Sequence, residues 1–172
     1  MAYYALRTKS SLLTLTLSMS RRGQHVRWLS GVKNLPTREN YAHFVKLQTR
    51  WNDMDSFSHI NNVIYYQFMD DAVNKHLLDN NIGIEHTRFV ASSSCNYLKP
   101  LTYPGDIDVG LRVSKLGNSS VTYDIGIFGS EESTPAAQGR YVHVYIDNKT
   151  ENPTPIQGKV RDVLSALSNG ET

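Results

Sequence analysis

The stretch that decides the fold is Arg50-Trp51-Asn52-Asp53-Met54-Asp55-Ser56-Phe57-Ser58-His59-Ile60-Asn61-Asn62-Val63-Ile64-Tyr65-Tyr66-Gln67-Phe68-Met69-Asp70-Asp71. Its polar segment, Asp53 to Asn62, holds two carboxylates, a histidine and two amides. Behind that segment, apolar residues recur at the spacing of one helix face: Tyr65, Phe68, Met69, Ala72, Val73 and Leu77. The pattern predicts a helix from about Asn62 to Asp79, with Asn61 or Asn62 as its N-cap. The polar segment therefore ends at a helix N-terminus, where free N–H groups favour an anion or a developing oxyanion.

The rest of the chain alternates apolar and polar residues in the manner of strands. A strand that begins at Phe44 is expected to carry Val45, Leu47, Thr49 and Trp51 on one face and to lead into the polar segment. Further extended segments are predicted near 86–98, 107–113, 121–127 and 137–147, and a last helix is predicted from Thr154-Pro155 to about Leu167. This order favours an α+β fold in which an antiparallel sheet covers one buried helix.

The motif also carries a resemblance. The string Arg50-Trp51-x-Asp53-x-Asp55-x-x-x-His59-Ile60-Asn61-Asn62-x-x-Tyr65 resembles the signature of hotdog-fold acyl-CoA thioesterases, in the branch similar to 4-hydroxybenzoyl-CoA thioesterase. The resemblance implies a curved antiparallel sheet wrapped around the central helix over roughly residues 43–166. It implies a homodimer or homotetramer with the active site at the subunit boundary. It also implies an acyl-CoA substrate and no cofactor beyond the CoA of that substrate.

The same resemblance assigns roles to two residues of the motif. Asp55 takes the place of the catalytic carboxylate, acting as nucleophile or as general base on a water, and Asn62 offers its backbone N–H to the thioester carbonyl. A simpler alternative for Asp55 is that it caps a turn. The chain departs from the family at Ser58, where many members have glycine, and in Asp70-Asp71-Ala72-Val73, where an expected arginine is missing.

The other polar residues of the motif have open interpretations. His59 polarises the water or the thioester, or it is a loop histidine bonded to a carboxylate. Asn61 orients Asp55 or a water, or it simply caps the helix. Tyr65 lies on the core face, from which it could contact the acyl chain. Asp53 is expected to hold the loop backbone. Since no further pair of ligands accompanies the carboxylates and histidine, we expect no metal site.

The charge is unevenly distributed along the chain. Residues 1–38 hold seven of the 18 Lys and Arg residues and no Asp or Glu, so residues 39–172 hold 11 basic against 16 acidic residues. We therefore divide the chain into a basic leader, 1–38, and one domain, 39–172. Nucleic-acid binding is not expected, because the domain lacks a basic cluster.

The leader is rich in Arg, Ser, Thr and Leu, which is typical of a mitochondrial transit peptide. A secretory signal is the competing interpretation, because Leu12 to Leu17 forms a short apolar core before Ser18-Met19-Ser20. A cytoplasmic location is a further alternative. No apolar run reaches the roughly 18 residues that a membrane span needs. Cys95 is the only cysteine, which excludes an internal disulfide.

The sequence thus predicts an acyl-CoA thioesterase that releases a free acid and CoA, with a fatty acyl-CoA as the expected substrate. One alternative is a non-catalytic hotdog protein that binds acyl chains or a protein partner in mitochondria, and another is a hotdog dehydratase. The sequence leaves three questions open: which acyl group is hydrolysed, whether CoA or an acyl carrier protein carries it, and whether Asp55 acts as nucleophile or as general base.

Overall fold

One antiparallel sheet and one long helix make up most of the computed structural model, which describes residues 35–168. The predicted leader lies outside the described residues except for its last four, and so do residues 169–172. In chain order the elements are η1 (Arg38–Asn40), β1 (His43–Gln48), η2 (Trp51–Asp53), α1 (Asn62–Asp79), β2 (Arg88–Tyr97), β3 (Asp106–Leu116), β4 (Ser120–Gly129), β5 (Ala137–Tyr145) and α2 (Gly158–Ser165).

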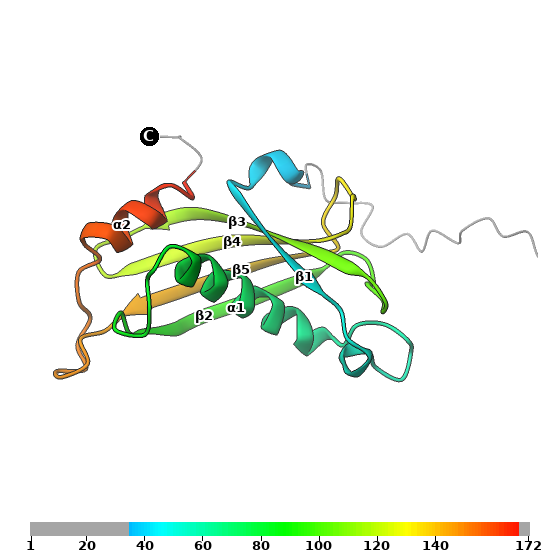
Figure 1. Ribbon diagram of the computed structural model, residues 1–172, viewed down its shortest axis with the longest axis horizontal. Coiled ribbons are helices and arrows are strands. Elements are labelled where there is room, and N and C mark those ends of the chain that lie inside the picture. The colour runs from blue at the N-terminus through cyan, green and yellow to red at the C-terminus, as the bar shows by residue number, and fades with distance from the viewer. Residues whose placement is uncertain (1–34, 169–172) are drawn as a thin grey trace, which may run out of the picture.

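The five strands lie in the order β1-β3-β4-β5-β2, and every neighbouring pair is antiparallel. β1 and β2 are therefore the two edges. In Figure 1, α1 lies across one face of the sheet and α2 lies at the end where β3 and β4 turn. This is the α+β architecture predicted from the order of the elements.

The core fills the space between α1 and the sheet. The six helix residues picked out by their spacing are all buried, and so are the inward-facing residues of β3 and β4, among them Val109, Leu111, Tyr123 and Ile125. Each fully buried large apolar side chain contributes about 1.5–3 kcal/mol to folding. The predicted helix face and the predicted bounds of α1, Asn62–Asp79, are confirmed.

A glycine sets the distance between α1 and the sheet. Gly139 of β5 lies directly beneath the helix, and a Cβ atom at this position would overlap the sulfur of Met69. Met69 is wholly buried, so it has no free space into which it could move. The helix can approach the sheet this closely only because residue 139 has no side chain.

The opposite face of the sheet is partly covered by the chain before β1. The ring of Tyr41 lies over two glycines, so that a Cβ would come within 2.8 Å of Tyr41 Cγ at Gly110 and within 2.6 Å of Tyr41 Cζ at Gly126. Phe44 and Phe128 pack edge-on against the same ring. Arg38, which composition placed in the leader, forms an ion pair with Asp108 at 2.7 Å.

Two local predictions differ from the structure. β1 ends at Gln48, and the Trp51 side chain is 70% exposed at the start of η2 instead of continuing the inward face. Thr49 N still donates to Gly105 O, at 2.9 Å, in register with β3. The chain then turns out of the sheet because Asp53 N donates to Arg50 O and the Asp53 carboxylate accepts Arg50 N. The last helix begins at Gly158 instead of at Thr154-Pro155, because Thr154 and Ile156 donate their N–H groups to Tyr145 O and Asn118 O.

Candidate active site

The motif folds into a closed hairpin between η2 and α1. Met54 and Ile60 face each other as an isolated antiparallel bridge, and Asp55 N donates to His59 O at 2.7 Å. Ile60 N donates to Leu101 O at 2.8 Å, which ties the hairpin to the segment that follows β2. The ends of the hairpin are therefore fixed, whereas its tip, residues 56–59, is exposed.

Asp53 anchors the start of this hairpin. Its carboxylate is 1% exposed and accepts hydrogen bonds from Arg50 N at 2.7 Å, Arg50 Nε at 3.0 Å and Arg50 Nη2 at 2.8 Å. Its carbonyl oxygen accepts the N–H of Asn61 at 2.8 Å. These contacts to the loop backbone are the ones predicted for Asp53, and they join the hairpin to the first residue before α1.

Asp55 is half-buried at the base of the hairpin tip. Its Oδ1 accepts hydrogen bonds from the N–H groups of Phe57 at 2.8 Å and His59 at 3.2 Å. Within residues 35–168, its Oδ2 receives no hydrogen bond. One oxygen therefore fixes the side chain while the other remains available for chemistry. Asp55 does cap the turn, as the simpler alternative proposed, through the two bonds to Oδ1. This capping role is compatible with a catalytic role for Oδ2.

The N-terminus of α1 begins directly beyond the hairpin. Asn61 is its N-cap, and Asn61 Oδ1 accepts the N–H of Val63 at 3.2 Å. The N–H of Asn62, the first helical residue, has no acceptor within the described chain, as is usual in the first turn of a helix. This leaves a polarised donor at the position where the sequence predicted an oxyanion to bind.

The remaining predicted residues occupy different surroundings. The backbone of His59 contacts Asp55, but its side chain is exposed and forms no hydrogen bond within residues 35–168. Tyr65 is buried, and its hydroxyl oxygen accepts the N–H of Leu101 at 3.2 Å. Burial raises the pKa of Tyr65, and the nearby charge of Asp55 adds to this effect, so the phenol stays protonated.

The structure adds a residue that sequence patterns did not single out. Tyr97, at the end of β2, donates its hydroxyl to Asn62 O at 2.9 Å, and its ring packs edge-on against Tyr65 at 5.2 Å between centroids. Its neighbour Cys95 has a pKa raised to about 11, mainly by burial, so its thiol is not a nucleophile at neutral pH. The end of β2 is thus part of the candidate site, although no local signal in the sequence indicates it.

Ser58 takes a conformation that explains the family pattern. Its φ of 62° lies in the left-handed region, where glycine is favoured. The turn after Asp55 therefore forms with serine in the place of glycine, and serine adopts this left-handed conformation at some cost in free energy. Within residues 35–168, no three His, Cys, Asp or Glu side chains gather as metal ligands.

The sequence matches a known protein family over most of its length. A family model described as the thioesterase-like superfamily matches residues 49–164, a span that includes the hairpin, α1 and all strands after β1. The chain belongs to the thioesterase-like superfamily. The predicted family and the predicted enzyme class, a thioester hydrolase, are thereby confirmed.

Solved structures agree with this assignment. The PA5185 protein of Pseudomonas aeruginosa is 41% identical, with a TM-score of 0.77 over 81% of this chain and 100% of its own. A thioesterase of Thermus thermophilus, solved with coenzyme A and Zn, is 27% identical with a TM-score of 0.65, over 75% of this chain and 96% of its own. The hotdog fold predicted from the motif is confirmed by these structural matches.

A curated bacterial protein also matches in sequence. The YsmA protein of Bacillus subtilis is 24% identical over 117 residues, which cover 66% of this chain and 78% of that protein.

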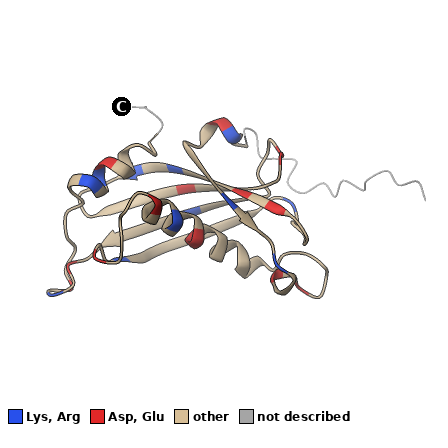
Figure 2. Cartoon of the chain, viewed as in Figure 1, with Lys and Arg blue, Asp and Glu red and all other residues tan. Residues whose placement is uncertain are grey.

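Charged residues of both signs are spread over the described part of this chain. Figure 2 shows Lys and Arg interspersed with Asp and Glu over its helices and its sheet. None of the helices within residues 35–168 combines the length and apolar character that a membrane crossing requires.

Proposed function

We propose that this thioesterase hydrolyses a fatty acyl-CoA to the free acid and CoA, with Asp55 as nucleophile or general base. One observation carries the proposal: the carboxylate with a free Oδ2 and the first N–H of α1 belong to a single hydrogen-bonded unit, joined through the bond from Asn61 N to Asp53 O. Thioester hydrolysis needs these two elements, a carboxylate and a donor for the developing oxyanion.

In this mechanism the thioester carbonyl lies against the N–H of Asn62. Asp55 Oδ2 either takes a proton from water, whose oxygen attacks the carbonyl carbon, or attacks that carbon itself to form an anhydride that water then cleaves. In both routes the C–S bond breaks and CoA leaves as the thiolate, which takes a proton from the protonated Asp55 in the first route and from water in the second. Asn61 holds the helix start, and Tyr65 borders the site. His59 is free to contact substrate, since its ring is exposed.

A second copy of the chain is expected to complete the site. Within residues 35–168, β2 is a ten-residue edge strand that is paired on one side only, and Phe89 and Val90 on it are exposed. Edge strands of this length are usually covered or paired. Antiparallel pairing of β2 with β2 of a partner would form a two-fold dimer, and it would bring the partner close to Tyr97 and Asn62. Sedimentation of the full chain tests this dimer, and a strictly monomeric protein would exclude it.

The test of the chemistry is thiol release from short, medium, long and aromatic acyl-CoAs by the full chain and by its Asp55→Asn variant. Asparagine retains an oxygen in the place of Oδ1, so the hairpin bonds to Phe57 and His59 are kept. We expect a loss of about 10²- to 10⁴-fold in kcat/KM, the range for a general base. Asp162→Asn, an exposed carboxylate on α2, is the matched control and should keep wild-type turnover.

A single turnover in ¹⁸O-labelled water tests for the anhydride. Label found in Asp55 establishes an anhydride that water cleaves at the Asp55 carbonyl, because a general-base route places the label only in the released acid. Undiminished turnover by Asp55→Asn would exclude both routes. Binding of acyl-CoA without turnover by the folded wild type would instead establish the non-catalytic acyl-binding protein.

We further propose that residues 1–38 direct the protein to mitochondria, on the basis of their composition. Import of a reporter that carries residues 1–38 into isolated mitochondria tests this proposal. Transport of the same reporter into the secretory pathway would contradict it.

A further inference from the structure

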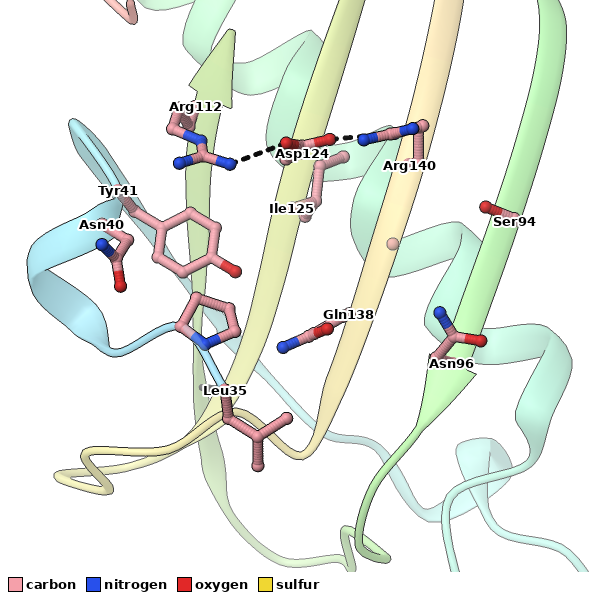
Figure 3. A pocket seen from close by; sticks show the side chains of 12 residues that line it. Leu35, Asn40, Tyr41, Ser94, Asn96, Arg112, Asp124, Ile125, Gln138 and Arg140 are labelled. Carbon is pink, nitrogen blue, oxygen red and sulfur yellow. Dashed lines mark hydrogen bonds and ion pairs between the residues drawn. The ribbon is translucent and has the colours of Figure 1, made fainter. Parts of the chain in front are cut away.

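A row of charged side chains crosses the sheet on the face opposite α1. Arg112 of β3, Asp124 of β4 and Arg140 of β5 occupy directly facing positions of adjacent strands, and Ser94 of β2 continues the row. Asp124 binds Arg112 Nη2 at 2.7 Å through Oδ2 and Arg140 Nε at 3.0 Å through Oδ1. In Figure 3 these three side chains form one chain of ion pairs, with α1 behind the sheet.

The row carries one unbalanced positive charge. Burial alone would raise the pKa of Asp124, but the hydrogen bonds and positive charges of Arg112 and Arg140 outweigh this effect and lower it. Asp124 is therefore ionised and neutralises only one of the two guanidinium groups. Arg112 Nε is buried and has no hydrogen-bond acceptor within the described chain. Arg140 uses Nε on Asp124, and its side chain is 61% exposed, so its terminal N–H groups are accessible.

A second row, next to the first, adds neutral donors. Gly126 faces Gln138, and Gln138 faces Asn96 on β2. The Nε2 atom of Gln138 is buried without an acceptor among residues 35–168. Tyr41, which lies over Gly126, has a pKa raised to about 12 by burial, so its hydroxyl is protonated and can donate. The side chains of both rows thus present more donors than acceptors.

These two rows form the floor of an open cavity of about 640 Å³, and Leu35 and Pro36 form part of its wall. Cavities of about 300–1,000 Å³ suit small organic ligands. Buried donors without acceptors are uncommon in proteins and call for an explanation. An anionic oxygen placed between Arg140 and Gln138 would supply the acceptor and balance the surplus charge, and paired oxygens would suit the guanidinium group.

We propose that this cavity binds a small organic anion, through a carboxylate or phosphate group held by Arg140, Gln138 and the Tyr41 hydroxyl. The anion would lie on the face of the sheet opposite the Asp55 hairpin. The site is therefore separate from the proposed thioesterase site, and its occupant does not need to be the substrate.

The test is calorimetric titration of the full chain at low ionic strength with three probes: succinate, inorganic phosphate and adenosine 3′,5′-bisphosphate. We expect saturable binding of at least one probe. Binding of succinate alone identifies a carboxylate site, and binding of the phosphates identifies a phosphate site. Arg140→Gln should weaken that binding about tenfold or more, the effect of losing a charged hydrogen bond.

Three further variants make the result specific. Tyr41→Phe keeps the ring over Gly110 and Gly126 and removes only the hydroxyl, so it should fold normally and bind several-fold more weakly. Lys159→Gln removes an exposed positive charge on α2, and it should bind as the wild type does. Asp55→Asn should also bind normally, because its site lies on the other face. Failure of all probes to saturate, or equal binding by Arg140→Gln and wild type, would overturn the proposal.

Discussion

Gly139→Ala tests how closely α1 must pack against the sheet. A Cβ at this position would overlap Met69 Sδ, well inside the separation of an ordinary van der Waals contact. Because Met69 is wholly buried, the strain must be relieved by movement of α1 or β5. Overpacking of this kind costs about 1–3 kcal/mol, while loss of glycine freedom in the unfolded chain returns about 0.4–1 kcal/mol. The net cost therefore lies between about 0 and 2.6 kcal/mol. Because the overlap is with a side chain that has no room to move, we expect the free energy of unfolding to fall by about 2 kcal/mol.

Urea unfolding of matched variants measures this cost. Gly129→Ala is the control, because the nearest atom to its Cβ would be Cδ of the exposed Glu132 side chain, at 3.2 Å. It gains the same unfolded-state effect without a rigid overlap, so its stability should change by less than about 0.5 kcal/mol. In a Met69→Ala background, which opens space above residue 139, Gly139→Ala should cost almost nothing. Equal costs in the two backgrounds, or no difference from Gly129→Ala, would refute the packing argument.

Two further predictions concern pH and the hairpin. Burial, with a smaller contribution from Arg88, lowers the pKa of His143 to about 4 from a usual 6.5, so the unfolded chain binds a proton that the folded chain refuses. The free energy of unfolding should therefore fall by about 3 kcal/mol in total as the pH drops from about 6.5 to 4. Urea unfolding at each pH measures this loss, and His143→Phe should abolish it. Identical pH profiles for the variant and the wild type would contradict the assignment to His143. Ser58→Gly should leave the free energy of unfolding unchanged or raise it by up to about 1 kcal/mol, whereas Ser58→Val should lower it by about 1–2 kcal/mol. If Ser58→Val were instead the more stable variant, the turn would not be strained at residue 58.

The parts of the fold that sequence predicted correctly depend on local interactions. The bounds of α1 follow from the spacing of its buried residues and from the Asn61 cap, both of which lie within or next to the segment itself. The position of Trp51 and the start of α2 were predicted wrongly. The start of α2 is set by a backbone hydrogen bond to a distant segment, from Thr154 to Tyr145. Trp51 leaves the sheet because Asp53 closes a turn on Arg50, and alternation of polar and apolar residues does not reveal that turn.

The candidate site shows the same division. Asp55 and Asn62 are close in sequence, so a motif alone is enough to predict that they lie together. Tyr97 reaches Asn62 from a strand 35 residues away, and this contact depends on how β2 lies beside α1. The row of Arg112, Asp124 and Arg140 depends on strand register, which alternation of polar and apolar residues alone does not specify.

The closure of the motif hairpin has a consequence for how relatives of this protein can diverge. The bridge between Met54 and Ile60 and the bond from Asp55 N to His59 O hold the base, whereas residues inserted between Phe57 and Ser58 would project into solvent. Lengthening a flexible loop is inexpensive, about 0.6 kcal/mol for each doubling. Insertions at this one point could therefore build a new wall over the acyl group while the carboxylate and the helix start stay in place, which offers a route to altered substrate selection by changing loop length alone.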